Sequence, residues 1–112
     1  MRALRFTVLL ISLLGGCKER QARSGILEVS VTAKGFEPAR IEVPASQKVV
    51  LRFVRKVAQT CADAVEVQGD PVRHMLPLDT PIDVTVTAPA SGELAFACPM
   101  NMYRGAIVVV GQ

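Results

Sequence analysis

The stretch LEVSVT, residues 27–32, alternates strictly between apolar and polar side chains. Because successive side chains of a β-strand point to opposite faces, this alternation predicts a strand with one buried face. Alternating or short apolar stretches recur at residues 40–43, 49–54, 65–67, 82–87, 94–97 and 105–110. Gly- or Pro-containing turns separate several of them. About seven short strands at this spacing predict an all-β protein, a β-sandwich, with no helix of useful length.

The charge balance gives no indication of a nucleic-acid partner. The chain carries 13 basic and 10 acidic side chains, for a formal net charge of +3. Arg2 and Arg5 lie in the N-terminal segment, so 11 basic side chains face 10 acidic ones in the remainder. A nearly neutral domain of mixed charge lacks the basic excess that binding to nucleic acid requires.

Residues 1–16 are typical of a secretory signal peptide. Arg2 and Arg5 form a basic start, and residues 6–14 are mostly apolar. This apolar run is shorter than the ~20 residues of a membrane-spanning helix, but it matches the apolar core of a signal peptide. We therefore expect an exported protein.

The sequence LGGC at residues 14–17 resembles the bacterial lipobox, in which small residues precede a cysteine that accepts a diacylglycerol group. The resemblance predicts lipidation of Cys17, which would anchor the protein at the cell envelope, facing the periplasm. Lys18, in place of an aspartate, favours the outer membrane in a Gram-negative cell. Residues 17–26 are then the lipidated cysteine and a flexible tether, and residues 27–112 form one domain. The alternative is a short uncleaved anchor with an ordinary cysteine.

Sulfur-containing side chains gather near the end of the chain. Cys98, Met100 and Met102 alternate where a predicted strand gives way to a loop, and Cys61 follows the strand at 49–54. Loops cluster at the ends of a sandwich, so Cys61 and Cys98 can meet in space. Thiolate and thioether ligands select Cu(I), whereas zinc and calcium prefer other ligand sets. The pattern predicts a site for a soft metal ion.

Another interpretation of the cysteines stays open. Two cysteines in an exported domain most often form a disulfide, here between Cys61 and Cys98. Methionines usually fill cores, but Met100 and Met102 lie in a turn-like stretch after a proline, which is a poor place for core packing. The methionines therefore favour the metal site.

His74 and Met75 lie in a polar, turn-rich segment. We expect His74, the one histidine of the chain, to be a surface-loop residue, and Met75 to pack beside Leu76. An ordinary blue-copper site needs two histidines beside its cysteine, so the sequence disfavours electron transfer of that type.

These residues together resemble a known family, the bacterial cupredoxin-like domains, which include EfeO-type, copper-ATPase-associated and CupA-like Cu(I)-binding domains. The resemblance covers about residues 27–110. It rests on GFEP at 35–38, IEV at 41–43, VVLRF at 49–53, Cys61, VEV at 65–67, LP at 76–77, Gly92 and FACPMNMYRG at 96–105. The early stretches indicate only the fold, and the four sulfur-bearing residues are the specific part.

The resemblance implies a Greek-key sandwich with a sulfur-rich Cu(I) site at one end. By position, Cys61, Cys98 and Met100 would hold one copper ion tightly, and Met102, with Cys98 bridging, a second ion more weakly. Pro99 departs from the family, which often has glycine there. Proline lacks an N–H that could have donated a hydrogen bond to the cysteine sulfur.

Together these observations predict a membrane-anchored copper-binding lipoprotein for copper resistance, sequestration or delivery. The expected partner is a copper-exporting ATPase or another copper acceptor, and the protein is expected to be a monomer. The scattered acidic residues and the lack of a Ser/His/Asp set give no support for an enzyme. Two alternatives stay open: an electron-transfer cupredoxin, and a lipoprotein without metal that has a structural Cys61–Cys98 disulfide.

Overall fold

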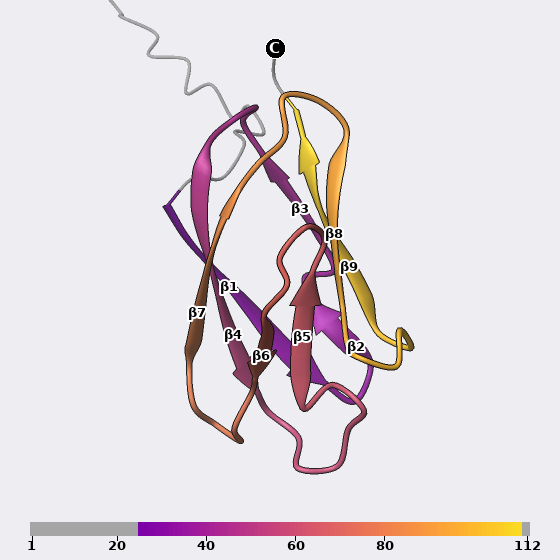
Figure 1. Ribbon diagram of the computed structural model, residues 1–112. Helices are drawn as coiled ribbons and strands as arrows, with labels where there is room; N and C mark the ends of the chain where they lie inside the picture. Colours follow the sequence, from indigo (N-terminus) through magenta and orange to yellow (C-terminus); the bar gives the residue numbers. More distant parts are fainter. Residues whose placement is uncertain (1–24, 111–112) are drawn as a thin grey trace, which may run out of the picture.

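Two β-sheets make up the described part of the chain. A computed structural model of the protein describes residues 25–110, which form nine strands and no helix (Figure 1). The strands are β1 (Gly25–Thr32), β2 (Gly35–Glu37), β3 (Arg40–Val43), β4 (Lys48–Arg55), β5 (Ala64–Val67), β6 (Arg73–Met75), β7 (Ile82–Thr87), β8 (Glu93–Ala97) and β9 (Arg104–Val109). One sheet has the order β2-β1-β4-β7 and the other β3-β9-β8-β5-β6. The predicted all-β sandwich is confirmed.

All seven strands expected from the sequence are present, and the structure adds two. β2 contains Gly35 and precedes Pro38, which is more typical of a turn, but it forms a strand because it pairs with the end of β1. β6 lies between Pro71 and Pro77 and has no alternating pattern, and it forms by pairing with β5. β1 also begins at Gly25, two residues before the predicted start of the domain.

The core is built from the alternating apolar positions of both sheets. Val29, Val31, Leu51 and Phe53 are completely buried in β1 and β4. The other sheet contributes buried side chains from four strands: Ile41, Val43, Val65, Val67, Phe96 and Ile107. Full burial of one such side chain stabilises the fold by about 1.5–3 kcal/mol, so the alternation determines which faces meet.

Three phenylalanines form an edge-to-face cluster within this core. The ring centroids of Phe36 and Phe96 are 5.1 Å apart, those of Phe53 and Phe96 5.5 Å, and those of Phe36 and Phe53 5.9 Å. Edge-to-face rings attract because the positive edge of one ring meets the negative face of the other. Phe96 lies two residues before Cys98, so the cluster fixes the end of β8.

The segments after β4 and β8 lie at the same end of the sandwich. In Figure 1 the connection from β4 to β5 is at the bottom, and the β8–β9 connection is at the lower right. β1 begins at the opposite end, because β1 and β4 run parallel in the same sheet. The fold therefore carries the regions of Cys61 and Cys98 to the end remote from Gly25.

The predicted signal peptide at residues 1–16, the predicted lipidation site Cys17 and the tether up to residue 24 lie outside the described residues. Within residues 25–110, no helix is long and apolar enough to cross a membrane. Lipid anchoring therefore stays a prediction from the sequence.

Candidate metal centre

Cys61 and Cys98 meet at the end of the sandwich. Their Sγ atoms are 3.6 Å apart although 37 residues separate them in the chain. Cys61 lies in the connection from β4 to β5 and is partly buried, whereas Cys98 directly follows β8 and is only 2% exposed. Both are free thiols. The expectation that loop clustering brings the two cysteines together is confirmed.

The loop after Cys98 is closed by its own backbone. The N–H of Cys98 donates to the carbonyl of Tyr103 (3.0 Å), and the N–H of Asn101 donates to the carbonyl of Cys98 (2.8 Å). Asn101 has a φ of 60°, a conformation that asparagine tolerates better than most residues. In this turn the N–H of Tyr103 donates to Cys98 Sγ over 3.2 Å. The cysteine sulfur therefore has a backbone donor even though Pro99 supplies none.

Tyr103 holds this loop against the other sheet. Its Oη donates to the carbonyl of Ala33 over 3.1 Å, and its ring packs edge-to-face on Phe36 with centroids 6.2 Å apart. Gly35 lies directly beneath the ring, where a Cβ would be 3.8 Å from it. This positioning role was not predicted, because it depends on a contact with Ala33, which lies 70 residues away in the chain.

The two thiols differ in acidity because their surroundings differ. Burial pushes the pKa of Cys98 upward, but the N–H of Tyr103, then the Cys61 thiol and the N–H groups of Met102 and Met100 together lower this pKa below the ordinary thiol value. Burial, followed by the hydrogen bond with Cys98, raises the pKa of Cys61. Cys98 therefore loses its proton first, and the Cys61 S–H then donates to the Cys98 thiolate.

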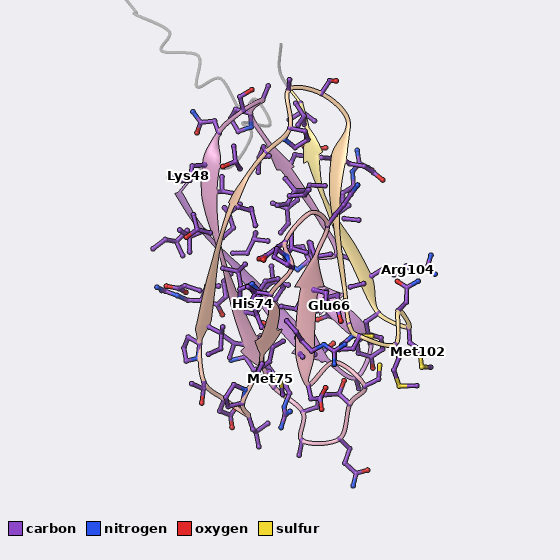
Figure 2. The ribbon with its side chains drawn as sticks, in the orientation of Figure 1. Lys48, Glu66, His74, Met75, Met102 and Arg104 are labelled. Atoms are coloured by element: carbon purple, nitrogen blue, oxygen red, sulfur yellow. The ribbon has the colours of Figure 1, made fainter. Side chains whose placement is uncertain are left out.

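Three methionines in β6 and the β8–β9 connection are exposed. Met100 is 71% and Met102 69% exposed, both in the β8–β9 connection, where Figure 2 shows Met102 pointing away from the sandwich. Met75 is 59% exposed, so the expectation that it is a packing residue beside Leu76 is wrong. Neighbouring residues at the end of a strand point to opposite faces, and it is Leu76 that is buried.

A surface hollow of about 330 Å³ opens beside Cys61. Sulfur from three separate segments lines it, contributed by Cys61, Met75 and Met100. The rest of the lining is Thr60, Asp63, Ala64, Arg73 and Pro99. Solvent can therefore reach Cys61 from outside through this hollow, whereas Cys98 does not line it.

His74 is a strand residue, not a loop residue as expected. It lies in β6 opposite Val65, and its Nε2 is 2.8 Å from Oδ2 of Asp70. His74 does not line the hollow beside Cys61. Within residues 25–110, no three His, Cys, Asp or Glu side chains gather to hold a metal ion.

The donor set fits a soft metal ion. Two thiols in contact can supply thiolate ligands, and exposed thioethers lie beside them. Soft ions such as Cu(I) prefer thiolate and thioether ligands, whereas hard ions prefer sets of oxygen ligands. Cys61, Cys98, Met100 and Met102 are thus the residues that could hold such an ion.

Solved structures similar to this chain include copper proteins. The metal-binding domain of the Cu(I)-exporting P-type ATPase CopA of Streptococcus pneumoniae D39, solved with Cu(I), has a TM-score of 0.68 at 21% identity, over 77% of this chain and 85% of that domain. A copper-binding protein solved in its apo form by NMR has a TM-score of 0.68 at 29% identity, over 81% of this chain and 93% of that one.

Auracyanins are also among the similar structures, and one of them, auracyanin A, is described as a blue copper protein. Dithionite-reduced auracyanin from Roseiflexus castenholzii has a TM-score of 0.61 at 19% identity, over 81% of this chain and 100% of that protein. No curated protein sequence matches the chain. The family model described as a cupredoxin-like domain matches residues 5–109, which is nearly the whole length. The chain belongs to the cupredoxin-like domain family.

Proposed function

We propose that this protein is a copper-binding protein that binds Cu(I) and transfers it to an acceptor protein. The observation that carries the proposal is the contact of the Cys61 and Cys98 sulfur atoms, 3.6 Å apart, beside exposed methionines. Cys61, Cys98 and Met100 would hold the first ion. Met102, with Cys98 bridging, would hold a second ion more weakly.

The arrangement of the sulfur atoms suits a transfer function. Cys98 has the lowered pKa and forms the first thiolate, and the Cys61 thiol releases its proton when an ion binds. Met100 adds a neutral thioether that is exposed to solvent. A thioether that reaches solvent can be exchanged for a ligand of the acceptor, while the buried Cys98 keeps its hold until the last step.

The acceptor we propose is a copper-exporting ATPase or another copper-binding protein. The similarity to the metal-binding domain of a Cu(I)-exporting ATPase supports this choice, although at 21% identity it establishes only a shared fold. Within the family, we place the chain with copper-ATPase-associated and CupA-like members. We propose binding and transfer, not catalysis.

We further propose that the protein is exported and held at the cell envelope through a lipid on Cys17. The basic and apolar residues of segment 1–16 and the LGGC sequence support this. β1, which starts at Gly25, begins at the end of the sandwich opposite the β4–β5 connection that contains Cys61 (Figure 1). A tether attached there would leave the metal site facing away from the membrane. Mass spectrometry of the protein from its native host tests this, with loss of the lipid mass in Cys17→Ser.

Electron transfer of the blue-copper type is less well supported. The chain has one histidine, and His74 is paired with Asp70 away from the hollow. Blue-copper sites use two histidines with the cysteine. The similarity to auracyanin, at 19% identity, extends to the fold alone.

An anaerobic competition titration with a coloured Cu(I) chelator tests the proposed function. The reduced protein should take up one or two ions. Cys98→Ser should cause the largest loss, Cys61→Ser a large loss and Met100→Leu a smaller one. In protein produced without lipid attachment, Cys17→Ser is the matched control, because it then removes a thiol outside the site and should not change the affinity. Failure to compete for Cu(I), with Cys61 and Cys98 paired in the isolated protein, would favour a structural disulfide instead.

A further inference from the structure

Met75 occupies an unusual position for an apolar side chain. It is the last residue of β6 and pairs with Ala64 of β5, three residues after Cys61. The next residue, Leu76, donates its backbone N–H to the carbonyl of Asp63 over 2.8 Å. These two contacts fix β6 against the segment that carries Cys61, and Figure 2 shows Met75 at the end of the strand nearest that segment.

Packing does not explain the exposure of Met75. Its side chain is 59% exposed, and it lines the hollow beside Cys61 together with Met100. One hollow of about 330 Å³ is thus lined by three sulfur-bearing residues. They come from the β4–β5 connection, β6 and the β8–β9 connection. Removing a thioether from water is favourable, so leaving three sulfurs around an open hollow forgoes stability that a packed core would provide.

The charges of the hollow suit a cation. The guanidinium of Arg73, the one basic group in the lining, is paired with Glu66 at 2.9 Å. Asp63 contributes a carboxylate to the same lining. Thioethers are neutral and polarizable, so they bind a soft monovalent ion without adding charge to the site.

We propose that Met75 is a further thioether ligand, which together with Met100 and Cys61 binds the soft monovalent ion in the hollow before it reaches the Cys61–Cys98 pair. The proposal rests on the proposed function, since it assigns the entry side of that site. The ion first contacts the two exposed thioethers and Cys61. It then exchanges Met75 for the thiolate of the buried Cys98, and the proton of Cys61 leaves to solvent.

Methyl NMR of the full chain labelled at methionine Cε, titrated with Ag(I), tests this assignment. Ag(I) is a soft monovalent ion that does not change oxidation state in the experiment. The Met75 methyl should shift together with that of Met100. Met75→Leu, which keeps the bulk and removes the sulfur, should weaken Ag(I) binding on the order of tenfold, or about 1.4 kcal/mol. Leu78→Met places a new thioether at an exposed position outside the hollow, and its methyl should not shift.

The outcomes separate this inference from the proposed function. If Ag(I) shifts the Met100 methyl and requires Cys98, but the Met75 methyl stays in place, Met75 is not a ligand and the inference fails alone. If the new methyl in Leu78→Met shifts as much as that of Met75, the response is unspecific thioether binding, and the inference fails as well. If the parent chain does not bind Ag(I) at all, both proposals fail.

Discussion

The backbone N–H of Tyr103 donates a hydrogen bond to Cys98 Sγ over 3.2 Å, across the loop that carries Met100 and Met102. The same residue ties this loop to the turn after β1, because its Oη donates to the carbonyl of Ala33. This turn and its anchoring side chain thus position the Cys98 sulfur, and the backbone N–H groups of the turn, together with the Cys61 thiol, lower the pKa of Cys98 against the opposing effect of burial. The chemistry proposed for this site depends on that turn.

The affinity for Cu(I) should rise with pH. A metal ion binds thiolate, so any proton still on a thiol must leave when the ion binds. Because the pKa of Cys98 is lowered and that of Cys61 is raised, binding releases two protons below both values, one between them and none above both. The logarithm of the affinity should therefore climb most steeply in acid and level off in base. Chelator competition at a series of pH values measures this, and an affinity independent of pH would argue against thiol ligands.

Replacement of His74 by alanine should leave Cu(I) affinity unchanged. His74 contacts Asp70 at 2.8 Å and does not line the hollow beside Cys61. The variant should lose only the contact with Asp70, and this pair lies partly exposed at the surface. The titration described for the cysteine variants provides the measurement. A large loss of affinity in His74→Ala would indicate that the histidine is a metal ligand, and it would favour an electron-transfer cupredoxin instead.

Gly105→Ala should destabilise the fold by about 1–3 kcal/mol, because extra volume in a packed core forces its neighbours to shift. A Cβ at this position would lie 2.3 Å from the ring of Phe96 and 2.9 Å from the carbonyl oxygen of Ala39. Phe96 is buried in the aromatic cluster and cannot turn away freely. Urea denaturation measures the free energy of unfolding.

Gly69→Ala is the control for that substitution. Gly69 has a φ of 81° and open space around it, so alanine there should cost only the backbone strain, about 1–2 kcal/mol. A second substitution, which makes the Phe96 side chain smaller, distinguishes the two glycine variants by their stability. Phe96→Leu should partly relieve Gly105→Ala and leave the cost of Gly69→Ala as it was. Equal behaviour of both glycine variants in the Phe96→Leu background would show that the close approach at Gly105 has no energetic consequence.

We expect Asp83→Asn to lower the free energy of unfolding at neutral pH. This difference from the parent protein should disappear in acid. Arg52 and Asp83 are partners across β4 and β7 and form two hydrogen bonds, of 2.8 and 3.0 Å. These bonds with Arg52 lower the pKa of Asp83. An aspartate with a lowered folded pKa stabilises the protein above its unfolded pKa of about 3.9, and the contribution disappears as the pH falls through the folded value.

The magnitude should be small and sensitive to salt, since both side chains of this pair are more than a third exposed. Denaturation midpoints of the parent and Asp83→Asn, at neutral and acidic pH and at two salt concentrations, measure it. A difference that persists unchanged in strong acid would show that the carboxylate charge is not its origin.

The alternation of apolar residues was sufficient to predict the sandwich, because burial of one face leaves little freedom in β1, β4 and β7. The two strands that were missed, β2 and β6, have three residues each and carry no period of their own. They form because a longer neighbour offers backbone groups for pairing. Short strands made by tertiary context leave no local signal in a sequence.

Of the candidate site, the cysteine pair could be predicted from the sequence, but the positions of Met75 and Tyr103 could not. Loop clustering in a sandwich predicted the meeting of Cys61 and Cys98, which the structure confirms. The placement of Met75 was wrong because it depends on β6, whose existence and register the sequence did not indicate. The role of Tyr103 depends on a contact with Ala33, 70 residues away, which no local pattern reveals.

X-ray absorption spectroscopy at the copper edge of the copper-loaded, reduced full chain tests the central claim most directly. We expect copper in the Cu(I) state with sulfur neighbours only, and a loss of sulfur neighbours in Cys98→Ser. A first coordination shell dominated by nitrogen or oxygen would contradict it, because the ligands would then not be the cysteines and methionines at this end of the sandwich.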